Sequence, residues 1–412
     1  MKKIPTSELR VGMFVVDTGM SWIDNPFLFS EEGTIVALEK VHAILNEGYK
    51  EVFIDPERGW SGPEAKSGLS AEEEIEVALE LLATAKTRER PARVKAPIEE
   101  EIQVARKLYT DSLKLARSFA SDIKQGSQLD YAKSEQFVEE AIDSVMRNPD
   151  ALISLTKLRS FDEYTYTHSI NVAVMAVAFG KHLGLGNAML QPLGMSALFH
   201  DVGKALIPNS VLNKPGKLTD AEFAIIQAHP FKGYVLLHDQ RALSDEILRG
   251  VVEHHEKYNG RGYPSGLVGE RISLFGSIIT VVDVYDALTS DRVYKKGMQP
   301  NKALSIMYGM REQDFAPKFV EQFIKCLGIY PVGSLVRLSD QQIAVVSGSN
   351  PDRPLFPTVK IILDAKLRPR APEVIDLSEN RVKALKEQKI SLKIEEHLDP
   401  KEYKLDPAMY LL

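Results

Sequence analysis

The middle third of the chain gathers side chains that could bind metal ions. Five of the nine histidines and two aspartates fall on the apolar sides of consecutive predicted helices. They are His168, His200, Asp201, His229, His254, His255 and Asp283. Imidazole nitrogens and carboxylate oxygens, with no thiolate nearby, suit Fe, Mn, Zn or Ni better than a structural cysteine-type zinc site. Seven donors exceed one tetrahedral shell, so the set predicts two divalent ions that share a bridging carboxylate.

A lone histidine on an apolar face is more often a hydrogen-bonded core residue than a metal ligand. That alternative is weaker for the whole set, because burying five imidazoles and two carboxylates costs on the order of several kcal/mol unless they are paired or metal-bound. The other four histidines, His42, His182, His238 and His397, have no chemical role by this reasoning.

Helical periodicity is expected to position the first donors. His168 shares a helical face with Val172, at i and i+4. His200 lines up with Ala197 on a helix that is expected to run as far as Pro208. Both imidazoles are therefore expected on the inner side of long helices.

The later donors follow the same pattern. His229 comes after Ile225 on the apolar side of the next predicted helix, and His254 shares a face with Val251. Asp283 lies in an otherwise apolar helix. A carboxylate in such a place needs a cation.

The stretch HHEKYNGRGYP, residues 254–264, sets two of these histidines against a flexible turn. Gly260 and Gly262 let the backbone bend sharply beside the histidines. Pro264 biases Tyr263 towards an extended backbone. A helix-ending turn with a packed tyrosine is the alternative, but the adjacent histidines favour a loop that covers a site.

Composition limits the broad class of protein. The chain has 412 residues, which at roughly 100 to 200 residues per domain predicts two or three domains. A net charge of -6 and a pI near 5.9 argue against a DNA-coating protein. Cys326 is the only cysteine and no apolar h-region follows the first lysines, so a cytoplasmic protein without membrane insertion is expected.

The chain is expected to be mainly α, with small domains at both ends. The expected parts are a small α+β domain at 1–62, a linker and amphipathic helices at 63–149, a helical bundle at 150–327 and a β-rich extension at 328–412. The second part includes an acidic helix over 71–85. The amphipathic helices before 150 allow either a homodimer or packing against the bundle.

The motifs resemble a known family. HD at 200–201 followed by VGK, the HHEKYNGRGYP stretch and VVDVYDALTSDRVY strongly resemble the HD-GYP domain, a branch of the HD-superfamily metal-dependent phosphohydrolases that degrades bacterial cyclic di-GMP. The resemblance covers roughly 150–325 and implies an HD-GYP catalytic domain at 150–327. The first 60 residues are similar to a small domain of unknown function often found ahead of HD-GYP domains.

The resemblance implies how the donors divide between two metals. One set is His168, His200, Asp201 and Asp283, and the other is Asp201, His229, His254 and His255, with Asp201 as the bridge. Some family members have a glutamate at the position of Tyr164, which supports a third metal. Two divalent ions are therefore expected here, with Fe or Mn ahead of Ni or Zn. Asn259 replaces the more usual aspartate and should turn as readily.

The resemblance also assigns substrate contacts. Asp201 and Lys204 are the expected catalytic residues, Lys204 holding non-bridging phosphate oxygens as charge builds. Arg292 and Lys295 match positions that contact phosphate and base, although both could be solvated charges, and Tyr263 could stack on guanine. Glu256 is expected to bind an imidazole or the loop backbone, and Asp286 to orient a ligand or pair with Arg292.

The implied reaction is hydrolysis of cyclic di-GMP to pGpG by a hydroxide activated by two metals, with cleavage to GMP left open. The same site could prefer another nucleotide, such as cyclic GMP-AMP or a phosphorylated guanosine alarmone. A non-catalytic receptor or scaffold, which binds the dinucleotide or docks a diguanylate cyclase (GGDEF) through the GYP loop, is the alternative of another class. Lost metal ligands would mark it, and none is lost.

Overall fold

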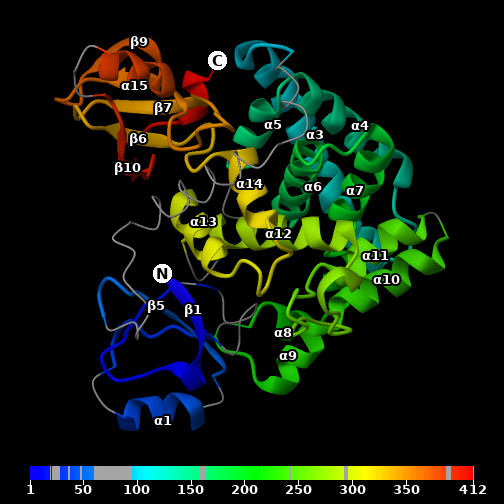
Figure 1. Cartoon of the computed structure of the whole chain (residues 1–412). Helices are drawn as coiled ribbons and strands as arrows, with labels where there is room; N and C mark the ends of the chain where they lie inside the picture. Colours follow the sequence, from blue (N-terminus) through cyan, green and yellow to red (C-terminus); the bar gives the residue numbers. More distant parts are fainter. Residues whose placement is uncertain are drawn as a thin grey trace.

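The computed structural model describes residues 1–18, 20, 28–35, 38–46, 49–59, 95–157, 164–214, 216–241, 243–291, 296–386 and 391–411. A helical domain forms the centre of the molecule, and Figure 1 shows a small sheet domain at its lower left and another at its upper left. This arrangement confirms the predicted fold class. The acidic helix expected over 71–85 lies outside the described residues.

The N-terminal domain is a sheet with one helix. Its elements are β1 (Lys2–Pro5), β2 (Phe14–Val15), β3 (Leu28–Phe29), β4 (Gly33–Thr34), α1 (Leu38–Asn46) and β5 (Glu51–Ile54). The strand order is β1-β5-β2-β4, with β3 paired in parallel to β5. Ile4, Val52 and Ile54 contribute to a separate hydrophobic core on one face of this sheet. The domain therefore has an interior of its own.

The helical domain contains the predicted bundle. Its helices are α3 (Ile98–Lys124), α4 (Tyr131–Arg147), α5 (Pro149–Leu155), α6 (Tyr164–His182), α7 (Asn187–Phe199), α8 (Asn209–Leu212), α9 (Asp220–Gln227), α10 (His229–Asp239), α11 (Asp245–Glu253), α12 (Leu274–Thr289), α13 (Pro300–Gly309) and α14 (Phe319–Leu327). The apolar face of α3 packs onto this bundle through buried residues such as Ile102 and Ala105, which is one of the two arrangements that the sequence allowed.

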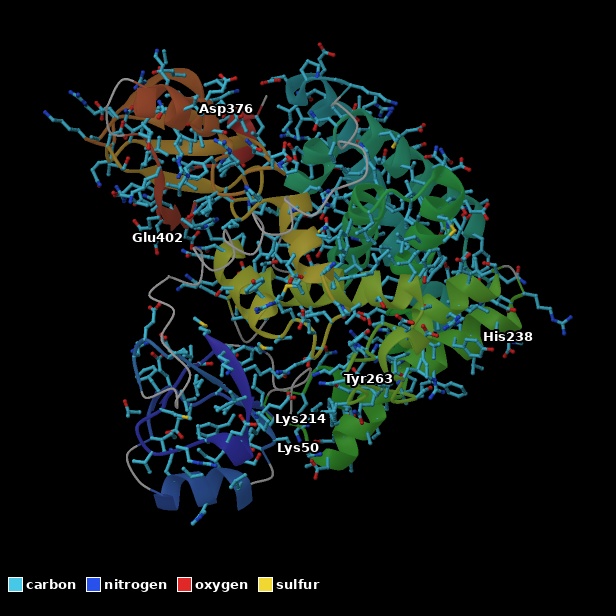
Figure 2. All side chains as sticks on the ribbon, viewed as in Figure 1. Lys50, Lys214, His238, Tyr263, Asp376 and Glu402 are labelled. Carbon is cyan, nitrogen blue, oxygen red and sulfur yellow. The ribbon has the colours of Figure 1, made fainter. Side chains whose placement is uncertain are left out.

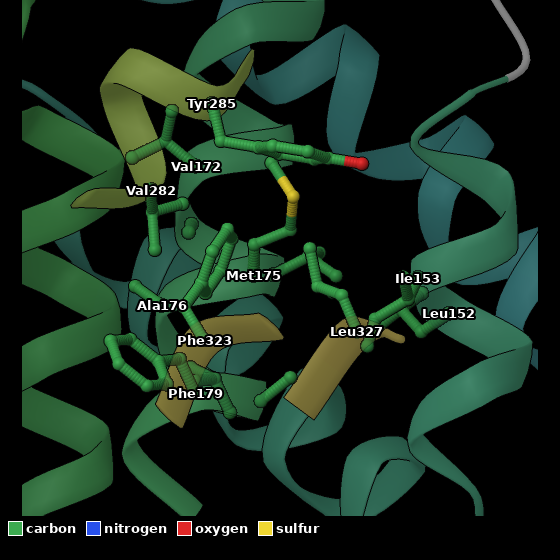
Figure 3. Packing of buried hydrophobic residues seen from close by; sticks show 14 of the residues in the cluster. Leu152, Ile153, Val172, Met175, Ala176, Phe179, Val282, Tyr285, Phe323 and Leu327 are labelled. Atoms are coloured by element: carbon green, nitrogen blue, oxygen red, sulfur yellow. The ribbon is translucent and has the colours of Figure 1, made fainter. Parts of the chain in front are cut away.

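Helices α6 and α12 lie at the centre of the bundle and are apolar on nearly all sides. The Phe179 ring packs edge-on against the Phe323 ring at 5.1 Å, and Tyr285 meets the same ring at 5.3 Å (Figure 3). Met175 lies in the same cluster. Because α6 and α12 are held by close packing, polar side chains on them have defined positions.

The C-terminal domain is a five-stranded antiparallel sheet in the order β10-β6-β7-β8-β9. Its elements are β6 (Leu335–Leu338), β7 (Ile343–Gly348), β8 (Thr358–Leu363), β9 (Pro369–Asp376), α15 (Leu377–Lys386) and β10 (Ile394–Leu398). The expected β-rich extension is confirmed. The first three strands are buried apolar runs, whereas β9 is largely exposed and has no such run.

His397 on β10 should make the stability of the protein fall in acid. Neither ring nitrogen has a hydrogen-bond partner among the described residues, and burial, with a smaller contribution from Lys157, lowers the pKa of His397 to about 3. In the unfolded chain His397 binds a proton below about pH 6.5, whereas in the folded chain it stays neutral down to about pH 3. The contribution of the neutral ring to stability is therefore fully present above about pH 6.5 and is lost as the pH falls towards 3.

We expect His397→Leu to remove this dependence. The free energy of unfolding of the variant, relative to wild type, should rise by about 1 kcal/mol between pH 7.5 and pH 5.5, measured by urea titration at both values. All other titratable groups are common to both proteins and cancel in the comparison. A difference that does not change with pH would contradict the prediction.

Candidate metal centre

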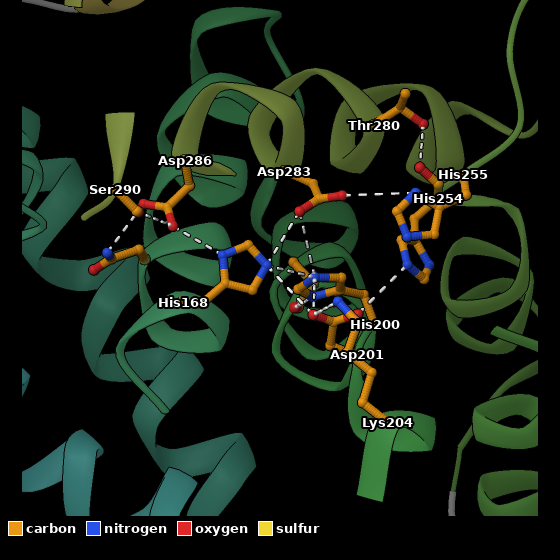
Figure 4. A network of polar contacts seen from close by, with 12 residues as sticks. His168, His200, Asp201, Lys204, His254, His255, Thr280, Asp283, Asp286 and Ser290 are labelled. Atoms are coloured by element: carbon orange, nitrogen blue, oxygen red, sulfur yellow. Dashed lines mark hydrogen bonds and ion pairs between the residues drawn. The ribbon is translucent and has the colours of Figure 1, made fainter. Parts of the chain in front are cut away.

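The predicted donors converge in the middle of the bundle in two groups (Figure 4). One group is Asp201, His229, His254 and His255, and the other is His168, His200 and Asp283. In each group the potential ligand atoms lie within 4.8 Å of one another. All seven side chains are buried except His255, which is half-buried. The fold therefore brings together every donor that the sequence singled out.

Three of the histidines lie at helix ends, and the prediction that the helix of His200 runs as far as Pro208 was wrong. Helix α7 ends at Phe199, one residue before His200, and α11 ends at Glu253, one residue before His254. His229 begins α10, after a break that follows α9. Ile225 is 38% exposed and so does not share a buried face with His229.

The helix ends explain how these rings are oriented. The last carbonyl groups of a helix lack intrahelical partners. The Nδ1 atoms donate to carbonyl oxygens three residues earlier, His200 to Ala197 at 2.7 Å, His229 to Ile226 at 2.8 Å and His254 to Val251 at 2.7 Å. Each hydrogen bond fixes the ring and turns its Nε2 atom towards the other donors.

The Nε2 atoms of these rings suit a cation. His168 and His200 bring their Nε2 atoms to 3.3 Å, and His229 and His254 bring theirs to 3.2 Å. With the proton on Nδ1, each Nε2 presents a lone pair, and two facing lone pairs repel unless a cation lies between them. Oδ1 of Asp201 is also buried without a hydrogen bond among the described residues. The residues present therefore fit bound divalent metal ions.

The charge states match those of metal ligands. Burial lowers the pKa of His200, and burial together with the neighbouring imidazoles holds the pKa values of His254 and His255 well below the ordinary range, so these rings are neutral. Burial alone would raise the pKa of Asp201, but Lys204 and the surrounding imidazoles hold it well below its usual value. Neutral imidazole and ionised carboxylate are the forms that bind metal.

Asp286 is hydrogen-bonded to the His168 ring, and its expected role of orienting a metal ligand stays a prediction. Its Oδ2 atom accepts a hydrogen bond from Nδ1 of His168 at 2.8 Å and another from the Ser290 hydroxyl at 2.9 Å. Its Oδ1 atom accepts from the Asn171 amide at 3.1 Å. The carboxylate is 1% exposed, so this network is sheltered from water.

We expect Asp286→Asn to weaken metal binding and turnover by about 10 to 100-fold, because an amide is a poorer acceptor for the imidazole proton. Elemental analysis and turnover assays measure both effects. Ser290→Ala removes one hydrogen bond to the same carboxylate and should cost less, and Asp239→Asn on the surface serves as control. Equal activity of Asp286→Asn and this control would contradict the role.

The loop after α11 is held by Glu256. Its carboxylate accepts hydrogen bonds from the amides of Ser265 at 2.7 Å and Leu267 at 2.9 Å, so Glu256 binds the loop backbone and not an imidazole. Gly260 has a φ of +78°, and a Cβ atom at Gly262 would lie 2.2 Å from the nitrogen of residue 257. Both glycines are thus required by the path of the chain.

Lys204 and Tyr263 face the donors from two sides. Nζ of Lys204 lies 2.6 Å from Oδ2 of Asp201, and its side chain is 26% exposed. The Tyr263 ring lies 4.7 Å from the His255 ring at 30°, and 6.3 Å from Phe223. The peptide bond before Pro264 is cis. The loop thus places an aromatic surface beside the second group of donors. Arg292 and Lys295 lie outside the described residues.

Three family models together match most of the chain. A family model described as an HD domain matches residues 142–319, a domain of unknown function (DUF3391) matches 1–134, and a KOW domain associated with the HD domain matches 335–404. The cyclic di-GMP phosphodiesterase PA4108 of Pseudomonas aeruginosa is 38% identical over 378 residues, which are 92% of this chain and 89% of that protein. The chain belongs to the HD-GYP branch of the HD-domain proteins.

Other relatives match the middle of the chain. The cyclic di-GMP phosphodiesterase response regulator RpfG of Xanthomonas campestris is 41% identical over 146 residues, 35% of this chain and 39% of that protein. The 3'3'-cGAMP-specific phosphodiesterase 3 of Vibrio cholerae is 37% identical over 168 residues, 41% of this chain and 36% of that protein. Among the described residues of this HD-GYP chain, no helix is both long and apolar enough to span a bilayer.

Two polar groups that support the HD-GYP site were missed in the sequence. Asn171 lies one turn after His168 on α6, where a polar residue on an apolar helix was an available signal, and it accepts a hydrogen bond from Tyr109 at 2.7 Å. Asp314 is 3% exposed and pairs with Lys3, 311 residues away. No local pattern could predict a partner at that distance.

Proposed function

We propose that the chain is a metal-dependent phosphodiesterase that hydrolyses cyclic di-GMP to pGpG. The observation that carries this proposal is a complete set of imidazoles and carboxylates, arranged in two groups beside Lys204, in a chain that matches PA4108 over 92% of its length. Further cleavage to GMP, and a reducing cytoplasm suited to the single cysteine, the half-buried Cys326, belong to the same proposal.

The proposed site holds two divalent ions, Fe or Mn ahead of Ni or Zn. The donors divide as the family resemblance implies, and Asp201 lies between the groups, with Oδ1 at 3.2 Å from Nε2 of His229 and Oδ2 at 3.4 Å from Nε2 of His168. This position supports a bridging role for its carboxylate. When bound, two such ions neutralise phosphate charge and lower the pKa of water.

The protein side chains around the metals have separate roles in the proposal. Lys204 balances negative charge on the non-bridging phosphate oxygens as the bond to the departing ribose oxygen breaks. The Tyr263 ring offers a flat surface to a guanine base. Asp286 keeps the His168 ring in one tautomer, and Glu256 holds the loop backbone through its hydrogen bonds to Ser265 and Leu267. Arg292 and Lys295 remain predicted contacts to phosphate and base.

A second substrate is favoured by one observation. The chain is also 37% identical to a 3'3'-cGAMP-specific phosphodiesterase over 168 residues, so a mixed dinucleotide is the alternative substrate. A diguanylate cyclase partner and a homodimer stay predictions. Because the donor set is complete, a non-catalytic receptor is a weaker proposal.

The test is direct. Protein purified without oxygen should contain about two metal ions per chain by elemental analysis and should convert cyclic di-GMP to pGpG, followed by chromatography. Turnover of 3'3'-cGAMP in parallel ranks the two substrates. Metal-loaded protein that leaves cyclic di-GMP intact would refute the proposed activity, and absence of bound metal would refute the role given to the histidines.

A further inference from the structure

The N-terminal sheet buries both of its faces. Along β1, β3 and β5, side chains alternate between the domain's own core and the helical domain. Ile4, Phe29, Val52 and Ile54 point to the first, and Lys3, Leu28 and Phe53 point to the second. Phe53 is fully buried, and a Cβ atom added at Gly309 of α13 would lie 3.3 Å from its ring. The domain is therefore packed tightly against the helical domain.

A buried charge cluster crosses this interface. Nζ of Lys3 lies 2.9 Å from both carboxylate oxygens of Asp314 and 3.0 Å from Glu51. The same Asp314 carboxylate pairs with Nζ of Lys257 at 3.0 Å. The side chains of Lys3 and Asp314 are each 2% exposed, so solvent screens this pair only weakly. Two cations from different domains thus share one carboxylate.

The Asp314 segment supports the loop that carries the GYP motif. The amide of Tyr258 donates to the carbonyl of Asp314 at 3.1 Å, and the amide of Asn259 donates to the carbonyl of Gln313 at 2.8 Å. These bonds hold the first half of the loop, and Glu256 holds the second half. The position of the loop therefore depends on a segment that Lys3 anchors.

The N-terminal domain also reaches the catalytic pocket. A pocket of about 70 Å³ is lined by His255, Lys204 and Tyr263, among others, and by Met20 of the N-terminal domain. Figure 2 shows Tyr263 on the side of the helical domain that faces the N-terminal domain. Ligand pockets for whole drug-sized molecules measure roughly 300 to 1,000 Å³, so this one suits a phosphodiester group, and attached bases must lie along its rim.

We propose that the N-terminal domain is part of the substrate site, with Lys3 as a positioning residue for the GYP loop and Met20 as a wall that contacts the bound dinucleotide. This inference rests on the proposed function for its substrate. The loop positioning is independent of that substrate. The N-terminal domain thus contributes to substrate binding by the hydrolase and is not only a separate module attached to it.

The first experiment measures the loop itself. In full-length Lys3→Met, hydrogen exchange of the amides at 257–268 should be about tenfold faster than in wild type, because Asp314 keeps only one of its two cations. Lys40→Met is the matched control, since Lys40 lies in the same domain in an exposed ion pair with Glu31. Lys3→Arg should restore slow exchange. Exchange in Lys3→Met equal to that in Lys40→Met would overturn the inference.

The second experiment separates positioning from general damage. In Lys3→Met, KM for cyclic di-GMP should rise about fivefold to tenfold, whereas kcat for bis(p-nitrophenyl) phosphate, which needs little of the loop, should stay within about twofold. Equal loss of kcat on both substrates would show a merely structural role and overturn the inference. Wild type without cyclic di-GMP turnover, but with the exchange effect present, would refute the proposed function alone.

Met20 provides a variant whose folding is not in question, because its side chain is half-buried. Met20→Ala should raise KM for cyclic di-GMP about threefold to fivefold through lost apolar contact, while exchange of the loop amides stays as in wild type. An unchanged KM would overturn the role of the N-terminal domain as a pocket wall, whatever the outcome for Lys3→Met.

Discussion

Replacing Asp201 with alanine is expected to reduce cyclic di-GMP hydrolysis by about a thousandfold or more and to lower the metal content below two ions per chain. The two oxygens of Asp201 face different groups, Oδ1 towards His229 at 3.2 Å and Oδ2 towards His168 at 3.4 Å. Its loss removes a ligand from each group. It also leaves Lys204 without the carboxylate that lies 2.6 Å away.

The measurement combines elemental analysis of protein purified without oxygen with chromatography of the products. Asp201→Asn keeps the shape of the side chain and removes its charge, so it separates the loss of a ligand from the creation of a cavity. Asp239→Ala, at an exposed position, serves as the control. Two metals and near-normal turnover in Asp201→Ala would show that the carboxylate does not bridge.

Replacing Lys204 with methionine is expected to lower kcat by about 100 to 1,000-fold while leaving the metal content near two ions per chain. The ammonium group of Lys204 is half-buried beside Asp201 and lines the pocket. In the proposed reaction it stabilises the negative charge that develops on the phosphate oxygens. Methionine keeps most of the length of the side chain and removes its charge and its hydrogen-bond donors. Because the metals bind to other atoms, KM and metal content should change much less than kcat.

The matched control is Lys232→Met, because Lys232 is a half-buried lysine on α10 whose Nζ atom donates to the carbonyl of Leu206 at 3.1 Å. Lys204→Arg should recover part of the rate, since charge is retained with altered geometry. If metal content falls together with kcat in Lys204→Met, Lys204 acts by holding Asp201 and not by meeting the phosphate.

The identity of the donors could be predicted from the sequence because the motifs are local. HD at 200–201 and HHE at 254–256 place imidazoles and a carboxylate side by side in the chain, and burial of so many polar groups requires a cation. Periodicity also predicted the helical bundle and the β-rich C-terminal extension. Strand β9 was not predicted, because an exposed edge strand has no alternating apolar pattern.

The ends of the helices could not be predicted from periodicity. The sequence continues an apolar pattern through Phe199 and into Val202, yet the chain leaves the helix at His200. A ring that donates from Nδ1 to a free carbonyl group stabilises the end of the helix and turns Nε2 inward, and this gain depends on donors from other helices being present.

The sequence by itself determined which side chains can bind metal, the order of the domains and the flexible loop beside the histidines, because these depend on residue type and short spacing. Only the tertiary structure decided that Glu256 binds the loop backbone and not an imidazole, and that Lys3 anchors the loop through Asp314. The physical reason is that a buried ion pair across 311 residues is set by the packing of two domains, which no local pattern records.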